Sequence, residues 1–172
     1  MKIKNSFRGR WPSVRMMILW VAVFLPLFCF GSRDSSSFDG YFAKANEARA
    51  IDDYAKALQF LNAAMTEAEK KNQKQDQLKV LVESAILHLM LNQFDLALEK
   101  LFSAEALSKS LKDSLGLAEV YNTIGANYHM QDELDKAANF YNNSIQLYLS
   151  LDKKNEIARA YNNLGVLWKD RQ

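Results

Sequence analysis

Three residue types that cross-link, break or loosen a chain are scarce in this sequence of 172 residues. It has one cysteine, Cys29, and two prolines, Pro12 and Pro26, and its six glycines are isolated from one another. Residues 32–172 therefore contain no disulfide, no thiolate nucleophile and no cysteine metal ligand. Because proline breaks helices, its absence over this range favours long, uninterrupted helices. Without clustered glycines there is also no glycine-rich phosphate loop.

Positive charge is scarce too once the first residues are set aside. The whole chain has 22 basic and 20 acidic residues, a formal net charge of +2. Five of the basic residues and none of the acidic ones lie in residues 1–31, so residues 32–172 have 17 basic against 20 acidic residues. Nucleic-acid binding needs clustered positive charge, which this range does not supply. We therefore expect no nucleic-acid partner.

The one long hydrophobic run lies near the N-terminus, where residues 16–30 read MMILWVAVFLPLFCF. Basic residues precede it, and small and polar residues follow it. This order is typical of a secretory signal peptide, and the run is short for a membrane span, which needs about 20 apolar residues. We interpret residues 1–31 as a signal peptide cleaved after Gly31. Residues 32–37 then form a polar linker in which Ser36 or Ser37 caps the first helix.

Two other interpretations of residues 1–31 stay open. Trp11 and Val14 extend the apolar stretch, so residues 11–30 are also suited to an uncleaved signal anchor. A lipoprotein signal would place the lipid on Cys29, but the bulky Phe28 stands where such signals have a small residue. In each case we expect the rest of the chain to be exported, either periplasmic or attached to the outer side of the cytoplasmic membrane. Residues 11–30, if retained, would be its only membrane contact.

The remainder of the chain repeats with a period of 40 residues. Residues 121–128 read YNTIGANY, and residues 161–168 read YNNLGVLW. Other columns extend the repeat toward the N-terminus: an alanine column of Ala57, Ala97 and Ala137, and a small-residue column of Ala45, Ala85, Gly125 and Gly165. A repeat of this length indicates stacked supersecondary units.

Within each unit the apolar residues follow the 3.6-residue period of an α-helix, and a short polar turn separates two such helices. One pair cannot bury its apolar faces alone, so successive pairs must stack. The sequence therefore predicts an all-α fold, an α-solenoid of antiparallel helix pairs over 38–172. The predicted helices are 38–51, 53–71, 75–91, 94–110, 114–130, 133–151 and 155–170.

The columns also predict two local features that tie the helices of a pair together. Gly125 is expected to face Ala137, which would let two antiparallel backbones approach closely. Asp52, Asn92 and Asp132 come just before each second helix. Aspartate and asparagine are preferred N-cap residues, so we expect them to cap these helices.

These columns resemble those of the tetratricopeptide repeat (TPR) in its 40-residue, bacterial form. The resemblance covers three helix pairs and the first helix of a fourth, and it rests on Tyr121, Ile124, Gly125, Tyr128, Ala137 and Tyr141, and again on Tyr161, Leu164, Gly165 and Trp168. The period departs from the usual 34 residues, and the closing proline is missing. The resemblance implies a TPR-like superhelix that binds a protein or peptide in its concave groove.

In such a superhelix the first helices of the pairs line the groove. The inward-facing positions place the candidate partner-binding residues at Glu119, Asn122, Thr123 and His129 in the third unit and at Arg159, Asn162 and Asn163 in the fourth. The asparagines would hydrogen-bond the backbone of an extended peptide, and Arg159 would bind a carboxylate. An ordinary solvated face explains the same residues, and this alternative stays open. The basic and asparagine residues with which chaperone-binding members hold a terminal carboxylate are not reproduced, so that ligand is not expected.

No nucleophile–base pair or metal-ligand set is visible, and the two histidines, His88 and His129, lie in different repeats. We therefore expect a non-enzymatic binding scaffold with no cofactor and no metal. The alternative is the N-terminal sensor region of a membrane signalling protein, a histidine kinase or transcription regulator, truncated at its C-terminus. The fourth unit, which has only its first helix before Gln172, motivates this alternative. A terminal cap with a polar outer face is the other interpretation of that helix.

Overall fold

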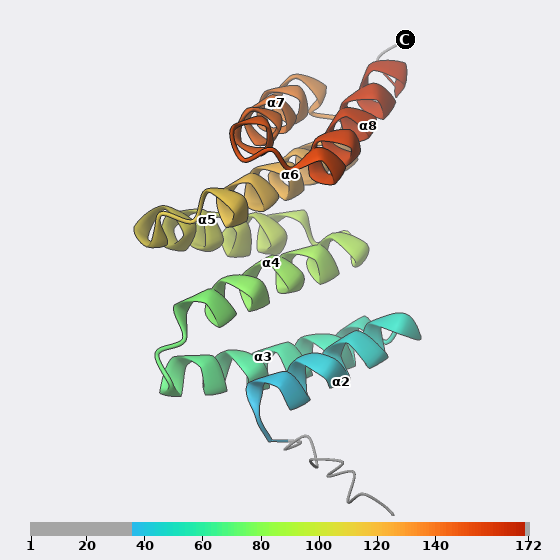
Figure 1. The fold of residues 1–172 in the computed structure, drawn as a ribbon. Helices are drawn as coiled ribbons and strands as arrows, with labels where there is room; N and C mark the ends of the chain where they lie inside the picture. The colour runs from blue at the N-terminus through green and yellow to red at the C-terminus, as the bar shows by residue number, and fades with distance from the viewer. Residues whose placement is uncertain (1–35, 171–172) are drawn as a thin grey trace, which may run out of the picture. The chain divides into compact units, whose positions relative to one another are not determined.

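The computed structural model describes residues 36–170, so the predictions for the signal peptide and for most of the linker lie outside the described residues. The described residues form one compact unit. These residues contain seven α-helices and no strand (Figure 1): α2 (Phe38–Ala50), α3 (Tyr54–Lys70), α4 (Lys74–Met90), α5 (Phe94–Leu111), α6 (Ser114–Met130), α7 (Leu134–Ser150) and α8 (Lys154–Asp170). The predicted all-α fold is confirmed, and each predicted helix end lies within one residue of the observed one.

A residue in the left-handed conformation ends each helix from α2 to α7, and it recurs every 20 residues: Asp52, Asn72, Asn92, Lys112, Asp132 and Asp152, with φ between 50° and 61°. At each turn the next amide N–H donates to a carbonyl five residues back, as Asp53 does to Ala48 at 3.0 Å. This bond satisfies a carbonyl that the helix end would otherwise leave without a partner. Because the six turns are alike, the chain reverses at regular intervals and the helices stack as pairs.

The predicted capping role of Asp52, Asn92 and Asp132 is wrong, because these residues take the left-handed position. The residue after each of them is the N-cap: Asp53, Gln93 and Glu133. A short polar side chain that can bond locally tolerates the left-handed conformation, which explains why Asp and Asn recur there. The predicted cap of the first helix is confirmed at Ser37, whose Oγ accepts the Gly40 N–H at 3.2 Å.

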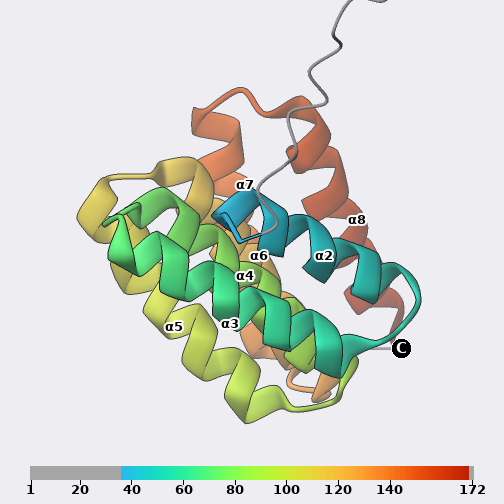
Figure 2. The same cartoon turned by 90° about the horizontal axis from the view of Figure 1, so that it is seen from below.

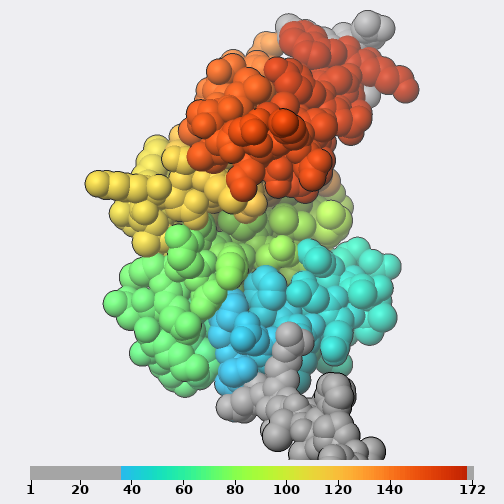
Figure 3. All heavy atoms as spheres, viewed as in Figure 1, coloured from blue at the N-terminus to red at the C-terminus, as the bar shows by residue number. Residues whose placement is uncertain are grey.

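Each helix packs against the helices before and after it in sequence, and α6 also contacts α4 and α8. The first helices of the pairs thus approach one another directly. In Figure 2, seen from below, α3 and α5 lie on one side of the stack and α2 and α8 on the other. Figure 3 shows the surface colours running from blue at α2 to red at α8, so distant units of the chain do not intermix on that face.

The core runs along the stack, and the small residues of the repeat columns lie at its centre. Ala57, Ala97 and Ala137 are each 0% exposed. The three heavy atoms nearest to a Cβ built on Gly125 all belong to the ring of Tyr141. Gly125 therefore makes room for a large side chain of the paired helix. The predicted approach of Gly125 to Ala137 stays a prediction.

Candidate functional site

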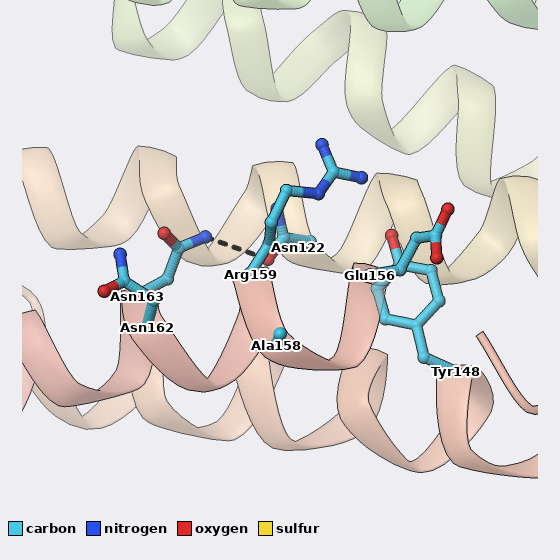
Figure 4. A pocket seen from close by; sticks show the side chains of 7 residues that line it. All are labelled: Asn122, Tyr148, Glu156, Ala158, Arg159, Asn162 and Asn163. Atoms are coloured by element: carbon cyan, nitrogen blue, oxygen red, sulfur yellow. Dashed lines mark hydrogen bonds between the residues drawn. The ribbon is translucent and has the colours of Figure 1, made fainter. Parts of the chain in front are cut away.

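Two adjoining cavities lie along the first helices of successive pairs. The larger, of about 560 Å³, is lined by Asn122, Tyr148, Glu156, Ala158, Arg159, Asn162 and Asn163 (Figure 4). The smaller, of about 270 Å³, is lined by Val82, Glu83, Ile86, Glu119, Asn122, Thr123, Tyr148 and Arg159. Asn122, Tyr148 and Arg159 line both cavities, so the two form one continuous depression. We call it the groove; α4, α6 and α8 contribute to its walls, and α7 contributes Tyr148.

Six of the seven residues predicted to bind a partner line the groove: Glu119, Asn122, Thr123, Arg159, Asn162 and Asn163. His129 lines neither cavity, although it lies on the same helix as Asn122. Seven residues separate the two, which is about 10 Å along a helix axis. His129 therefore stands beyond the end of the groove. The structure brings the other six together, and their binding role stays a prediction.

The asparagines of the third and fourth units are joined across the groove. Asn163 Nδ2 donates to Asn122 Oδ1 at 3.1 Å, which links α8 to α6 (Figure 4). This bond orients both side-chain amides. It uses one donor and one acceptor, and it leaves the Nδ2 group of Asn122 and the Oδ1 atom of Asn163 for a ligand. A donor next to an acceptor is the complement of a peptide backbone.

Sequence reasoning did not place Tyr148 in the groove, and it also missed Val82, Glu156 and Ala158. Tyr148 comes from a second helix, α7, and is only 2% exposed, yet it lines both cavities. Burial raises its pKa to about 12, so the phenol is protonated near neutral pH. A signal was present in the sequence, because the two preceding residues of its column are the small Ala68 and Ser108. A tyrosine in a column of small residues marks a place where the packing changes.

The charges that line the groove are mostly negative. Three carboxylates, on Glu83, Glu119 and Glu156, accompany one guanidinium, on Arg159. Arg49 offsets the first of them, since its Nη1 lies 2.7 Å from Glu83 Oε2. Desolvation, followed by the negative charge of Asp113, raises the pKa of Glu119, and Arg159 opposes this rise. The raised pKa of Glu119 therefore reflects its burial first and the charge of Asp113 second.

Within residues 36–170, no group of three or more histidine, cysteine, aspartate and glutamate side chains is placed to hold a metal ion. In the same range no helix combines the length and the apolar character that crossing a membrane requires. The groove itself presents amides, a phenol, carboxylates and a guanidinium. These are hydrogen-bonding and charged groups, and no nucleophile–base pair stands among the residues that line the groove.

Solved structures of other proteins share this arrangement of helices. The crystal structure of BtubC (BKLC) from P. vanneervenii matches with a TM-score of 0.68 and 18% identity, over 77% of this chain and 55% of that chain. The first TPR of Spaghetti (RPAP3), bound to the HSP90 peptide SRMEEVD, matches with a TM-score of 0.54 and 19% identity, over 77% of this chain and 96% of that chain. The likeness establishes the TPR fold that the repeat columns predict. No protein-family model matches the sequence, and no curated protein matches it.

Proposed function

We propose that this protein is a non-enzymatic scaffold that holds an extended segment of a protein or peptide in the groove. The observation that carries the proposal is the continuity of the groove over the first helices of three units. Packed helices lie about 8–10 Å apart, which is the length of about three extended residues. A groove that runs from α4 through α6 to α8 therefore suits about six residues of an extended chain.

The side chains of the groove suit the backbone of such a segment. The asparagine pair offers a donor on Asn122 beside an acceptor on Asn163, and the bond between them holds both amides in place before a ligand arrives. Because these amides are already ordered, less conformational entropy is lost on binding. Tyr148 forms a buried floor against which a ligand side chain can pack.

The charge of the groove favours a ligand that is neutral or basic. The RPAP3 domain was solved with the peptide SRMEEVD, which has three acidic residues. In this chain the groove has three carboxylates and one guanidinium, so an acidic segment would meet like charge. Juxtaposed like charges suppress binding of the wrong partner. A segment with a lysine or arginine would instead lie near Glu119 and Glu156, and a single ligand carboxylate would pair with Arg159.

Binding of fluorescein-labelled seven-residue peptides, screened as a library and followed by anisotropy, tests this proposal. Asn122→Ala and Asn163→Ala should each weaken the best ligand about fivefold, the equivalent of roughly 1 kcal/mol for one lost hydrogen bond. Asn143→Ala is the matched control, because Asn143 is exposed on α7 and lines neither cavity. If all three variants bind alike, the groove is not the binding site. If the best ligands are acidic, the charge preference is wrong.

We also propose that the protein is exported, on the basis of residues 1–31. Their basic start, apolar run and small-residue exit support this. N-terminal sequencing of the protein recovered from fractionated bacterial cells tests it, with a new N-terminus near Ser32 as the expected result. A membrane-bound product that keeps its first residues would favour the anchor at residues 11–30. A cytoplasmic product with Met1 intact would contradict export.

A further inference from the structure

The six turns between the helices fall on two opposite edges of the stack. Because successive helices run in opposite directions, the turns after α2, α4 and α6 lie on one edge, and the turns after α3, α5 and α7 lie on the other. Figure 1 shows the α2–α3 and α4–α5 turns at the right and the α3–α4 and α5–α6 turns at the left. The protein therefore has two edge surfaces, each built from its own set of three turns.

The two edges carry opposite charge. The first edge, which we call the acidic edge, consists of residues 50–54, 90–94 and 130–134. It has no basic residue and four acidic ones: Asp52, Asp53, Asp132 and Glu133. The second edge, which we call the basic edge, consists of residues 70–74, 110–114 and 150–154. It has two aspartates and six lysines: Lys70, Lys71, Lys74, Lys112, Lys153 and Lys154. The total charge of the chain hides this separation, because the two edges cancel.

Most of these edge charges form no ion pair within the described residues. One exception is Glu133, whose Oε1 atom lies 3.2 Å from Lys136 Nζ. The other is Lys70, whose Nζ atom lies 2.8 Å from Glu67 Oε1. The remaining carboxylates of the acidic edge and ammonium groups of the basic edge thus have charge to offer to a partner.

Exposed apolar side chains accompany the charge on both edges. On the acidic edge Ile51 is 73%, Met90 is 55% and Met130 is 50% exposed. On the basic edge Leu151 is exposed, and Leu149 is exposed just before this edge begins. Methionine is flexible and polarisable, so it adapts to the shape of an apolar partner surface. Each edge therefore combines one sign of charge with apolar area.

We propose that the acidic edge of one copy of this protein docks against the basic edge of a second copy. The partner is assigned as a second copy because both halves of the complementary pair are on the same chain. Two acidic edges, or two basic edges, would repel each other, so the contact joins unlike edges. Such a contact leaves one edge of each copy unoccupied, and further copies add there. The expected assembly is a row of copies that lengthens with concentration.

The proposed contact is separate from the groove. No residue of the acidic edge or of the basic edge lines either of the two groove cavities. Docking between the edges therefore uses none of the residues assigned to ligand binding. A failure of the proposed binding function would leave this proposal standing, and the reverse also holds.

Substitutions that copy the chain's own equivalent turns remove charge and keep the turn conformation. Asp52→Asn and Asp132→Asn place on the acidic edge the residue that Asn72 and Asn92 already hold in the left-handed conformation. We call this double change the acidic-edge variant. Lys112→Asn makes the same copy on the basic edge, and Lys71→Gln copies the C-cap residue Gln131. We call this second double change the basic-edge variant.

Sedimentation velocity of the full chain over a range of concentrations tests the proposal. We expect association at about 25 mM salt that weakens about tenfold at about 500 mM salt, where screening shortens the reach of surface charges. The acidic-edge variant and the basic-edge variant should each associate about fivefold more weakly than the original chain. The matched control is Glu47→Gln with Glu99→Gln, since both glutamates are exposed and lie outside the edges. It should associate as the original chain does.

An equimolar mixture of the two variants gives the sharpest result. The acidic-edge variant keeps its basic edge, and the basic-edge variant keeps its acidic edge. The mixture should therefore regain the association strength of the original chain. It should also stop at pairs with one copy of each variant, because the two edges that remain outside the contact are both altered.

Far-UV circular dichroism should show that both variants keep their helices. Glu133→Gln, which copies the N-cap Gln93, is a second acidic-edge change with the same expected direction. The proposal is overturned if the original chain does not associate, or if both variants associate as strongly as it does. The apolar run at residues 16–30, for example, would give association that neither variant changes. A mixture that associates no better than its components would also overturn it, because unlike edges would then not meet.

Discussion

A Cβ atom on Gly125 would lie 2.7 Å from Cδ1 and 2.8 Å from Cε1 of Tyr141. The Tyr141 side chain is 2% exposed, so its ring is held in the core of the α6–α7 pair. Gly125 on α6 and Tyr141 on α7 therefore pack as a pair, because the glycine leaves the space that the ring fills. In the same column Gly165 has no other atom within 4 Å of an added Cβ, which makes the two glycines a natural pair for experiment.

Replacing Gly125 and Gly165 by alanine should change the free energy of unfolding in opposite directions. Gly125→Ala places a methyl group inside the contact distance of a buried ring, an overpacking cost of about 1–3 kcal/mol. Gly165→Ala meets no such obstacle, and it should stabilise the protein by about 0.5–1 kcal/mol because alanine favours the helix. Urea unfolding midpoints measure both changes. A Gly125→Ala protein as stable as the original would contradict the packing described here.

Lys112 is the one residue of the left-handed series that is neither aspartate nor asparagine. Its φ is 55°, a conformation in which the side chain of an L-residue crowds the backbone. Lys112→Gly should relieve this and raise the free energy of unfolding by about 0.5–1 kcal/mol. Introducing a lysine at an equivalent turn, by Asn92→Lys, should lower the free energy of unfolding, because lysine tolerates the left-handed conformation less well than asparagine does. Thermal and urea unfolding of both variants test the pair, and equal effects of the same sign would contradict it.

Asn127 is a polar residue in a column of leucines. It is 0% exposed, while Leu87 and Leu167 hold the same position in the units on either side. Its Nδ2 atom donates to the Phe94 carbonyl at 3.0 Å, and its Oδ1 atom accepts a hydrogen bond from Gln131. Asn127→Ala should cost about 1–3 kcal/mol, since it removes these bonds and leaves a space.

Asn127→Leu should cost less than Asn127→Ala. The column already packs leucine in both neighbouring units, and the partly exposed Gln131 can turn to water. An apolar replacement of similar size can be nearly neutral when the former partners find others. Urea unfolding of the two variants side by side gives the comparison. A leucine variant less stable than the alanine variant would show that the hydrogen bonds, and not the filling of space, dominate at this position.

Stability should fall at high pH because of two buried tyrosines. Burial raises the pKa of Tyr141 and of Tyr148 to about 12, above the usual value of 10.0. Below pH 10 each phenol is protonated in both the folded and the unfolded chain. Between about pH 10 and 12 the unfolded chain loses these protons first, so unfolding becomes more favourable, by an amount on the order of 2 kcal/mol per tyrosine.

The double variant Tyr141→Phe, Tyr148→Phe lacks both phenols but keeps every lysine. Comparing it with the original chain therefore separates the contribution of the two tyrosines from that of the lysines, which titrate in both proteins. Urea unfolding at pH 8 and pH 11 should show a smaller loss of stability in the double variant. Equal losses would mean that the two phenols do not ionise more readily in the unfolded chain.

The helices and their ends could be predicted from the sequence because the signals for them are local. The apolar period of 3.6 residues, the polar turns and the absence of proline all act within a few residues of one another. Six of the seven candidate groove residues also come together as the periodicity requires. His129 does not, because a helix face continues past the point where the neighbouring helices stop enclosing a cavity.

Features that involve two helices were harder to predict. The column pattern shows that Gly125 must be small, but not that Tyr141, four residues beyond Ala137, lies opposite. Tyr148 lies under the groove only because α8 packs beside α6 and α7 at that point. The hydrogen bond from Asn163 to Asn122 likewise depends on the distance and rotation between α8 and α6.

The sequence by itself determined an all-α chain of paired helices, their limits within a residue and the face of each first helix that lines the groove. Only the tertiary structure decided which side chains meet across that groove and which carboxylates gather near Arg159. The physical reason is that helix formation depends on neighbours along the chain. Contacts between helices depend on how whole helices cross, which no single helix encodes.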